Sequence, residues 1–151
     1  MHEFTRTQMI PASLDECWRF FSDPRNLARI TPPNLGMKVI GECPAEMSAG
    51  LTIDLSVRPF PGIPVRWRTE ITRVEPPHCF VDEQRAGPYR QWRHEHYFRA
   101  VDESHTEMRD LVCYALPFGW LGDLANPWLV APQLRHIFDF RERVVREIFG
   151  G

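Results

Sequence analysis

The sequence predicts an α+β fold in which a curved, seven-stranded antiparallel sheet surrounds one long C-terminal helix, with two short helices after the first strand. Between residues 35 and 116, segments with a two-residue apolar period alternate with turns, whereas the last segment repeats apolar residues at three- and four-residue steps. The connectors are too short for parallel crossovers, so neighbouring strands are antiparallel. Because a single long helix must cover this sheet, we expect the sheet to curl around it and leave a hollow.

The length of 151 residues, without repeats or linkers, predicts a single domain spanning residues 1–151. The formal net charge of −2 gives no electrostatic reason to expect nucleic acid as a partner. No segment has the apolar length needed to cross a bilayer, and the N-terminus lacks a signal-peptide pattern. We therefore expect a cytoplasmic protein without stable membrane insertion, whose four well-separated cysteines are reduced and mostly buried.

The N-terminal elements follow from local signals. Residues 2–10 predict the first strand, and Pro11 ends it. Ser13 and Glu16 have the spacing of a capping box, which predicts that a short helix begins there. Residues 24–30 predict a second short helix.

Six further strands are expected between residues 35 and 116. The proline-rich segment 59–64 predicts a turn after the first strands of this region. The strands with clear bounds are 51–58, 65–75, 79–86, 90–101 and 106–116.

The C-terminal segment predicts a long amphipathic helix over residues 133–149, about 25 Å long at the usual rise per residue. Asn126 and Pro127 are candidates to cap its start. Pro132 instead favours a kink or a later start. The helix is long enough to lie across a whole sheet.

The last three strands carry polar residues on the face that should be buried. When each strand is divided by parity, one face holds most of the aromatic and aliphatic residues and the other holds most of the charges, so the first should face inward. The inward set is Phe80, Asp82, Gln84, Trp92, His94, His96, Phe98, Met108, Asp110, Val112, Tyr114 and Leu116.

Hairpin geometry predicts that these polar residues meet across the strands. A turn centred near residue 103 places His96 opposite Asp110, Phe98 opposite Met108 and Trp92 opposite Tyr114. A turn near Pro88 places Asp82 opposite His94 and Gln84 opposite Trp92. Opposed side chains are close enough to bond. We therefore expect a row of Asp–His and His–Asp contacts across three adjacent strands.

Arg141 lies within the apolar stripe of the last helix, between Phe138 and Val144. A buried guanidinium requires a partner, so one interpretation is that Arg141 reaches the acidic end of the row. In the other, its stem packs and its head group extends to water. The sequence leaves both open.

The polar row has four interpretations. It is a structural hydrogen-bond network, or a set of polar anchors in an apolar ligand cavity. The third is a metal site in which Asp110 or Asp82 joins His94 and His96, although an H-x-H pattern is a weak signal. The fourth is acid–base catalysis, with His94, His96 and Asp110 as candidate catalytic residues. No serine or cysteine shares this face, so a nucleophile is not expected. Two further tryptophans, Trp120 and Trp128, are candidates to line the hollow.

Several segments of the sequence resemble one known superfamily. They are Gly87–Tyr89, Trp92–Phe98, Thr106–Asp110, Tyr114–Pro117 and Ile137–Arg141. The chain resembles a bacterial branch of the START/Bet v1-like superfamily, the ligand-binding SRPBCC or polyketide cyclase/dehydrase-like proteins. The resemblance implies the helix-grip fold and a deep cavity for lipids, steroids, polyketides or similar molecules. It implies no single activity and no catalytic residue, because this fold serves many functions.

We therefore expect a protein that binds a small hydrophobic ligand between the sheet and the C-terminal helix, without a metal or an organic cofactor. A cyclase or dehydratase that uses His94 or His96 as acid–base is one alternative, and a structural or partner-binding module is another. The sequence does not indicate the oligomeric state. The expected ligand-binding residues are Trp67, Phe80, Gln84, Trp92, His94, His96, Asp110, Tyr114, Phe138 and Arg141.

Overall fold

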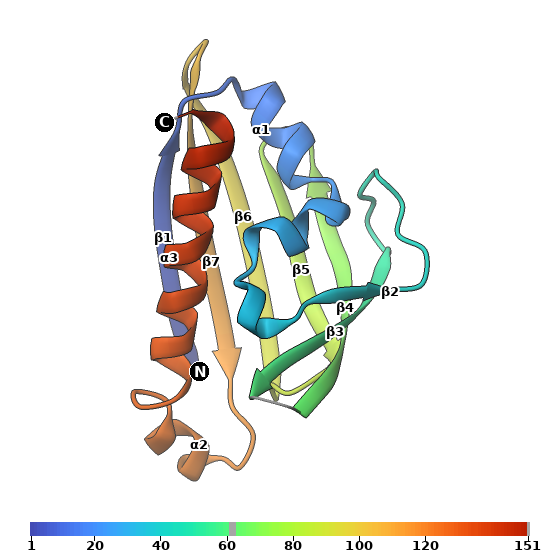
Figure 1. Ribbon diagram of the computed structural model, residues 1–151, viewed down its shortest axis with the longest axis vertical. Coiled ribbons are helices and arrows are strands. Elements are labelled where there is room, and N and C mark those ends of the chain that lie inside the picture. The colour runs from blue at the N-terminus through green and yellow to red at the C-terminus, as the bar shows by residue number, and fades with distance from the viewer. Residues whose placement is uncertain (61–62, 151) are drawn as a thin grey trace.

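The computed structural model describes residues 1–60 and 63–150 and contains one seven-stranded antiparallel sheet in the order β1–β7–β6–β5–β4–β3–β2 (Figure 1). The strands are β1 (His2–Ile10), β2 (Lys38–Ile40), β3 (Thr52–Phe60), β4 (Ile63–Glu75), β5 (Cys79–Ala86), β6 (Gln91–Asp102) and β7 (His105–Ala115). The helices are α1 (Leu14–Phe21), α2 (Trp120–Ala125) and α3 (Val130–Phe149), and two 3₁₀ segments cover Pro24–Ile30 (η1) and Pro33–Leu35 (η2). The predicted fold class, a helix-grip fold, is confirmed.

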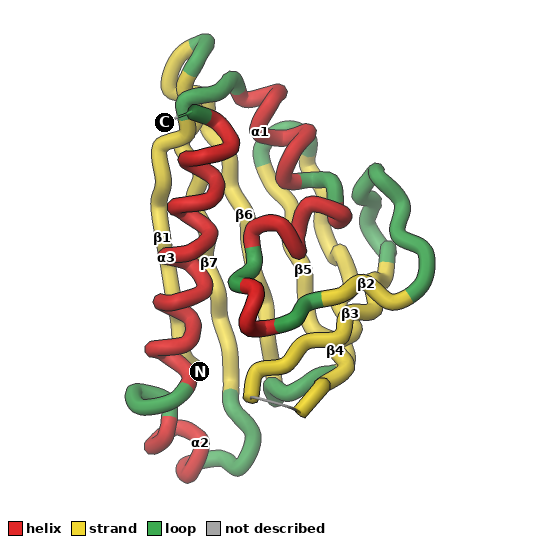
Figure 2. The backbone as a smooth tube through the Cα atoms, viewed as in Figure 1, coloured by secondary structure: helices red, strands yellow, loops and turns green. Residues whose placement is uncertain are grey.

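The long helix and the short helices lie over different parts of the sheet. α3 runs along β1 and β7, while α1 and the two 3₁₀ segments lie beside it, in front of the middle strands (Figures 1 and 2). β2 and β3 curve forward at the far edge, so the sheet forms an open trough (Figure 1). The sheet, α3 and the segment that follows β1 all contribute residues to the lining of a cavity.

The first helix begins as its sequence predicts. The Ser13 hydroxyl accepts a hydrogen bond from the Glu16 backbone N–H at 3.2 Å and caps α1. Its apolar face then packs on the sheet, where the Trp18 ring meets those of Phe80 and Phe98 edge-on, each with centroids 5.9 Å apart. These contacts close one end of the trough.

The connection between β7 and α3 differs from the prediction. α3 begins at Val130, three residues before the predicted start at residue 133. Pro132 lies in its first turn, where the missing N–H costs no intrahelical hydrogen bond. Asn126 does not cap this helix. It ends the unpredicted α2, and its side chain contacts the Tyr114 hydroxyl at 2.8 Å and His2 Nδ1 at 3.2 Å.

The centre of the turn expected at 59–64, residues 61–62, lies outside the described residues. Cys79 and Val81, on the parity expected to face water, are 3% and 0% exposed. Cys79 lies among the charges of Arg73 and Glu95, since long side chains can cover an outer sheet face. Cys17 is also buried, whereas Cys43 and Cys113 are half-buried.

The apolar core consists of three clusters that border a common interior. One joins β1, α1 and the end of α3 around Ile10 and Val145; a second surrounds Leu134 and Phe138; and a third surrounds Ile53 on β3. Across the described ranges, we find no helix with the length and apolar character to span a bilayer.

Candidate functional site

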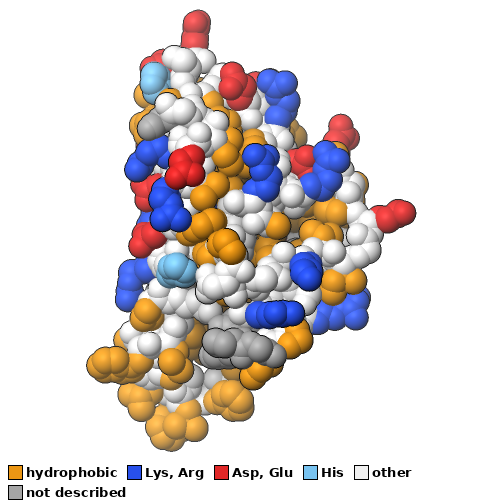
Figure 3. All heavy atoms as spheres, in the orientation of Figure 1, with side chains coloured by type: hydrophobic (Ala, Val, Ile, Leu, Met, Phe, Trp, Pro, Cys, Tyr) orange, Lys and Arg blue, Asp and Glu red, His pale blue; other side chains and the backbone are white. Residues whose placement is uncertain are grey.

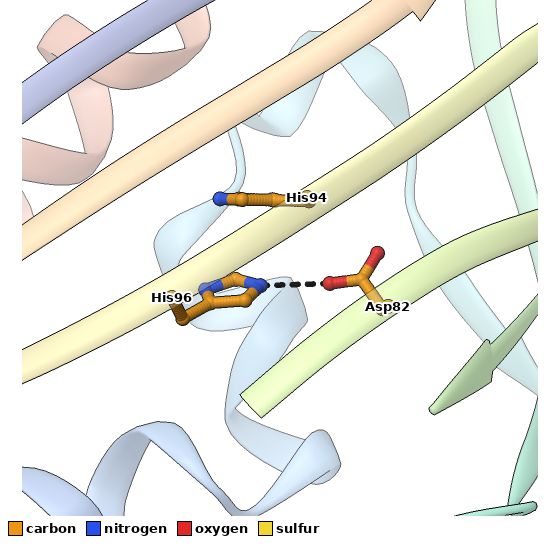
Figure 4. A group of neighbouring side chains, drawn as sticks. All are labelled: Asp82, His94 and His96. Atoms are coloured by element: carbon orange, nitrogen blue, oxygen red, sulfur yellow. Dashed lines mark hydrogen bonds and ion pairs between the residues drawn. The ribbon is translucent and has the colours of Figure 1, made fainter. Parts of the chain in front are cut away.

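The face of β6 that carries both imidazoles points inward, toward α3. His94 and His96 are 4% and 7% exposed, and the His94 ring lies 5.7 Å from the Phe138 ring on α3. Figure 4 shows the two rings rising from β6 on the same side, with Asp82 approaching from β5. The predicted orientation of this strand is confirmed.

The predicted strand register is confirmed for four residue pairs, but the side-chain hydrogen bonds join residues that are diagonal neighbours and not directly opposed. Asp82 pairs with His94 and His96 with Asp110 in the backbone register, as Phe98 does with Met108 and Trp92 with Tyr114. The hydrogen bonds instead join His94 Nε2 to Asp110 Oδ1 at 2.8 Å and His96 Nε2 to Asp82 Oδ2 at 2.7 Å. Diagonal neighbours on one sheet face are within reach of long side chains.

Aromatic stacking fixes the two imidazoles in place. The rings of His94 and His96 stack with centroids 3.6 Å apart, and Phe80 covers the other face of His96 at 4.0 Å. Trp92 meets His94 edge-on at 6.3 Å. Packed rings of this kind cannot rotate freely, so the nitrogen atoms keep fixed directions.

Gln84 does not face Trp92 as predicted. The pairing of β5 with β6 ends at Glu83 and Arg93, and the Gln84 side chain turns back to the loop. Its amide donates to the Tyr89 carbonyl at 2.7 Å and accepts from the Tyr89 N–H at 3.2 Å. A Cβ atom at Gly87 would lie 2.5 Å from Gln84 Oε1, so a larger residue there would displace the Gln84 side chain from these bonds.

Arg141 is buried beside the row, which supports the first of its two interpretations. Its side chain is 9% exposed, and its Nη1 atom lies 3.9 Å from Asp110 Oδ1, close enough for an ion pair. Its guanidinium carbon lies 4.8 Å from the centre of the Phe138 ring. Among the described residues, none accepts a hydrogen bond from its buried Nε.

The carboxylates of the row are held in their charged form. Burial alone would raise the pKa of Asp110, but hydrogen bonds from His94 and His96 and the charge of Arg141 lower it far below the usual range. The pKa of Asp82 is lowered for the same reasons. Burial opposes its charged form, but the hydrogen bond from His96 and the nearby positive charges outweigh burial.

The two histidines shift in opposite directions. Burial lowers the pKa of His94, and the neighbouring charge of His96 lowers it further, which outweighs the bond to Asp110. Burial also opposes the charged form of His96, but its two contacts, with Asp110 and Asp82, raise its pKa. His96 Nδ1 lies 3.4 Å from Asp110, so both of its nitrogens face carboxylates.

A cavity of about 600 Å³ opens beside this row. Its wall is mostly apolar and includes Ile53 and Leu55 on β3, Ile71 on β4, and Leu134 and Ile137 on α3. Polar side chains gather where β5, β6 and β7 face α3, chiefly those of Asp82, His94, His96, Asp110 and Arg141. The chamber is therefore hydrophobic with one polar wall.

Most of the residues that the sequence predicts for the ligand site line this cavity. Those that line the cavity are Trp67, Phe80, Trp92, His94, His96, Asp110, Phe138 and Arg141. Gln84 and Tyr114 are outside the lining, because Gln84 bonds Tyr89 and the Tyr114 hydroxyl bonds Asn126. Trp120 and Trp128 are 72% and 80% exposed and do not line it either. Whether a ligand contacts these residues stays a prediction.

The sequence analysis did not assign every lining residue to the site: it missed residues of regular elements, such as Ile53, Leu55, Ile71, Leu134 and Ile137, and residues of the segments between them. Leu27 and Ile30 come from η1, Met37 and Met47 flank β2, and Tyr89 comes from the β5–β6 turn. A helix was predicted at residues 24–30, but the sequence did not indicate that it faces the cavity, and the other three residues lie outside segments with strand or helix periodicity.

The β7–α3 connection forms an exposed apolar rim. It consists of Phe118, Trp120, Leu121, Leu124, Trp128 and Leu129, each more than half exposed. Figure 3 shows hydrophobic side chains gathered at the end of the molecule where α2 lies. Phe118 and Leu129 also line the cavity, so the apolar rim adjoins the chamber.

Asp82, His94 and His96 offer ligand atoms within 4.8 Å of one another, a grouping that could hold a metal ion. The 2.7 Å bond between His96 and Asp82 would have to open to admit an ion, and Arg141 adds positive charge nearby. These features favour a hydrogen-bond network over a cation site.

Comparisons with known proteins agree with this architecture. A family model described as polyketide cyclase/dehydrase and lipid transport matches residues 10–136. A comparison with curated proteins gave no match.

Solved structures share the fold at low sequence identity. The Zhui aromatase/cyclase from Streptomyces sp. R1128 is 16% identical with a TM-score of 0.74, covering 95% of this chain and 90% of that one. A START superfamily protein from Mycobacterium smegmatis is 13% identical with a TM-score of 0.73, covering 98% and 99%. Norcoclaurine synthase from Thalictrum flavum, solved with dopamine and hydroxybenzaldehyde, is 15% identical with a TM-score of 0.66, covering 97% and 87%.

The family match spans most of the chain, and the fold and the cavity agree with it. The chain therefore belongs to the polyketide cyclase/dehydrase and lipid transport family, and it shares its fold with the START superfamily protein.

Proposed function

We propose that this protein binds a small, mainly apolar molecule in the cavity between the sheet and α3. The observation that carries the proposal is a chamber of about 600 Å³ with an apolar wall and polar groups on one side. Ligand sites of roughly 300–1,000 Å³ with few polar anchors have this character. Trp67, Phe80, Trp92 and Phe138 would provide the apolar contact.

A neutral fluorescent probe tests this proposal. N-phenyl-1-naphthylamine carries no charge and brightens in apolar surroundings, so we expect saturable binding to the wild-type protein. Ala125 lines the cavity and is half-buried, so Ala125→Trp should fill space in the chamber and lower the affinity about tenfold. Ala100→Trp is the matched control, because Ala100 is exposed on β6 and lies outside the lining. Equal loss in both variants, or no saturable binding at all, would contradict the proposal.

Acid–base catalysis on the bound molecule is a second candidate function. The observation that favours it is the hydrogen bonding and the lowered pKa of His94. Its Nε2–H donates to the ionised Asp110, which leaves Nδ1 with the lone pair. Its lowered pKa keeps the ring neutral near pH 7, the form that a general base requires. His96, with both nitrogens facing carboxylates, would instead hold charge.

Proton exchange distinguishes catalysis from binding alone. Cyclisation and dehydration of carbonyl compounds begin with removal of a proton beside the carbonyl, so we expect the protein to speed deuterium exchange of 2-decanone in D₂O, followed by NMR. His94→Gln should abolish this exchange, whereas His105→Gln, at an exposed Asp–His pair, should not. Exchange at the protein-free rate, while the neutral probe still binds, would exclude this candidate.

A further inference from the structure

We infer that the cavity selects molecules with a carboxylate at one end, and that Arg141 is the group that binds it. This inference rests on the proposed binding function and names the chemical class of the ligand.

The guanidinium of Arg141 has unused hydrogen-bonding capacity. A guanidinium offers five N–H donors. Within residues 1–60 and 63–150, Arg141 donates no hydrogen bond, and its Nε is both unpaired and shielded from solvent. A buried charged donor without an acceptor is costly, so a ligand that supplies the acceptor gains affinity.

The two nearby carboxylates are committed to other partners. Asp110 Oδ1 accepts from His94 at 2.8 Å and faces His96 Nδ1 at 3.4 Å. Asp82 accepts from His96 at 2.7 Å and lies 3.4 Å from the Thr69 hydroxyl. The 3.9 Å separation between Arg141 and Asp110 is too long for a hydrogen bond. Arg141 is therefore held near the row by charge without being bonded to it.

The guanidinium also borders the chamber. Arg141 lines the cavity, and its head group lies over the Phe138 ring. A guanidinium donates in its own plane, so a ring packed against its face leaves the donating edges available. A carboxylate matches this fork with two parallel bonds, which a hydroxyl or a single carbonyl oxygen cannot form.

The rest of the chamber suits the remainder of such a molecule. Away from the polar wall, the lining contains Leu27, Leu55, Val57, Leu134 and Ile137. A ligand with a carboxylate on Arg141 would therefore place an apolar body against these side chains.

A series of matched ligands tests the inference. Decanoic acid, decanol and decylamine share one apolar chain, and each displaces N-phenyl-1-naphthylamine if it enters the cavity. For the wild-type protein we expect decanoic acid to bind about tenfold tighter than decanol, with decylamine weakest. Equal affinities for the acid and the alcohol would overturn the inference.

Variants assign the preference to Arg141. Arg141→Gln should bring the ratio of acid to alcohol affinity close to one, and Arg141→Lys, which keeps the charge but not the fork, should restore part of it. Arg143→Gln, at an exposed position on the same helix, should keep the wild-type ratio. A preference that survives Arg141→Gln would contradict the assignment.

The outcomes separate this inference from the proposed function. If the neutral probe does not bind the wild-type protein, the binding function itself fails. If the probe binds but the acid, alcohol and amine displace it equally, only the carboxylate preference fails. If Arg141→Gln does not fold, the wild-type series and Arg141→Lys still decide the question.

Discussion

His94 and His96 are two residues apart on one strand face, stack on each other, and still differ in their affinity for protons. His94 bonds one carboxylate, whereas His96 lies between two. At His96 the two carboxylates together outweigh the effect of burial and raise the pKa, whereas at His94 burial and the charge of His96 outweigh the bond to Asp110 and lower it. The polar row therefore contains one imidazole that favours the neutral form and one that favours the charged form.

An NMR titration of the two rings tests this assignment. We expect the Cε1–H resonance of His96 to titrate above pH 6.5 and that of His94 below it, since their pKa values shift in opposite directions from 6.5. His94→Gln and His96→Gln identify the two signals. Titration of both rings on the same side of 6.5 would contradict the account.

These shifts imply opposite contributions to stability. The raised pKa of His96 gives stability that is fully present below pH 6.5 and lost as the pH rises through the folded-state value. The lowered pKa of His94 works the other way, because the unfolded chain takes up the proton first as the pH falls below 6.5. The free energy of unfolding at several pH values should show a slope above pH 6.5 that His96→Gln removes.

Truncation of His96 measures the strength of the network. His96→Ala leaves the Asp82 and Asp110 carboxylates without a shared donor, so we expect the free energy of unfolding to fall by about 1–3 kcal/mol in urea titrations. His105→Ala breaks an exposed pair with Asp102 and should cost much less, because solvent screens that pair. Similar losses in the two variants would show that the buried row is not a stabilising network.

The residues of the row could be predicted from the sequence, but their bonds could not. Strand parity fixes which side chains share a face, and hairpin length fixes which residues are opposed, so His96 and Asp110 were paired correctly. The diagonal bonds depend on side-chain torsions that neither signal contains, as does the turn of Gln84 toward Tyr89.

Among the elements, α3 could be predicted from the sequence, whereas α2 in the connection before it could not. The amphipathic stripe of α3 predicts its existence and its buried face, including Leu134, Phe138 and Val145. α2 was missed because it is only one to two turns long and begins at Gly119 without a side-chain cap. Elements this short derive their stability from context, and their own propensity is too weak to predict them.

Substitutions of Phe118 test whether the backbone of the β7–α3 connection is strained. Phe118 is 82% exposed and has a φ of 70°, a left-handed conformation that asparagine tolerates better than other side chains. Phe118→Asn should therefore raise the free energy of unfolding by roughly 0.5–1 kcal/mol, read from urea or thermal unfolding. Phe118→Ala retains the unfavourable φ and should give no gain. Equal stability of the two variants would argue against strain at this position.

At the scale of the whole molecule, a single long helix covers a seven-stranded sheet and leaves part of the interior open. The sequence predicts this hollow from the imbalance between seven strands and one long helix. It does not predict that η1, the residues around β2 and the β5–β6 turn contribute to the wall, because a local sequence pattern does not indicate where such short segments lie relative to the sheet. Two residues of the apolar rim, Trp120 and Trp128, were candidates to line the hollow but are exposed.

Because part of the interior is open, truncation of a buried side chain beside the cavity should destabilise the protein less than truncation of one away from it. Ile10 on β1 is fully buried and does not line the cavity, whereas Ile53 on β3 is buried but borders it. Ile10→Ala should cost about 2–5 kcal/mol, and Ile53→Ala less, since part of its surroundings is already empty. Urea unfolding of both variants measures the difference. A larger loss at Ile53 would indicate that the interior is filled.

Native mass spectrometry of freshly purified protein tests the central claim, a cavity that holds a guest molecule, most directly. We predict a second population whose extra mass corresponds to a small molecule, released on unfolding and reduced in Ala125→Trp but not in Ala100→Trp. An unmodified mass alone, together with no mass increase after incubation with decanoic acid, decanol or the neutral probe, would contradict the account.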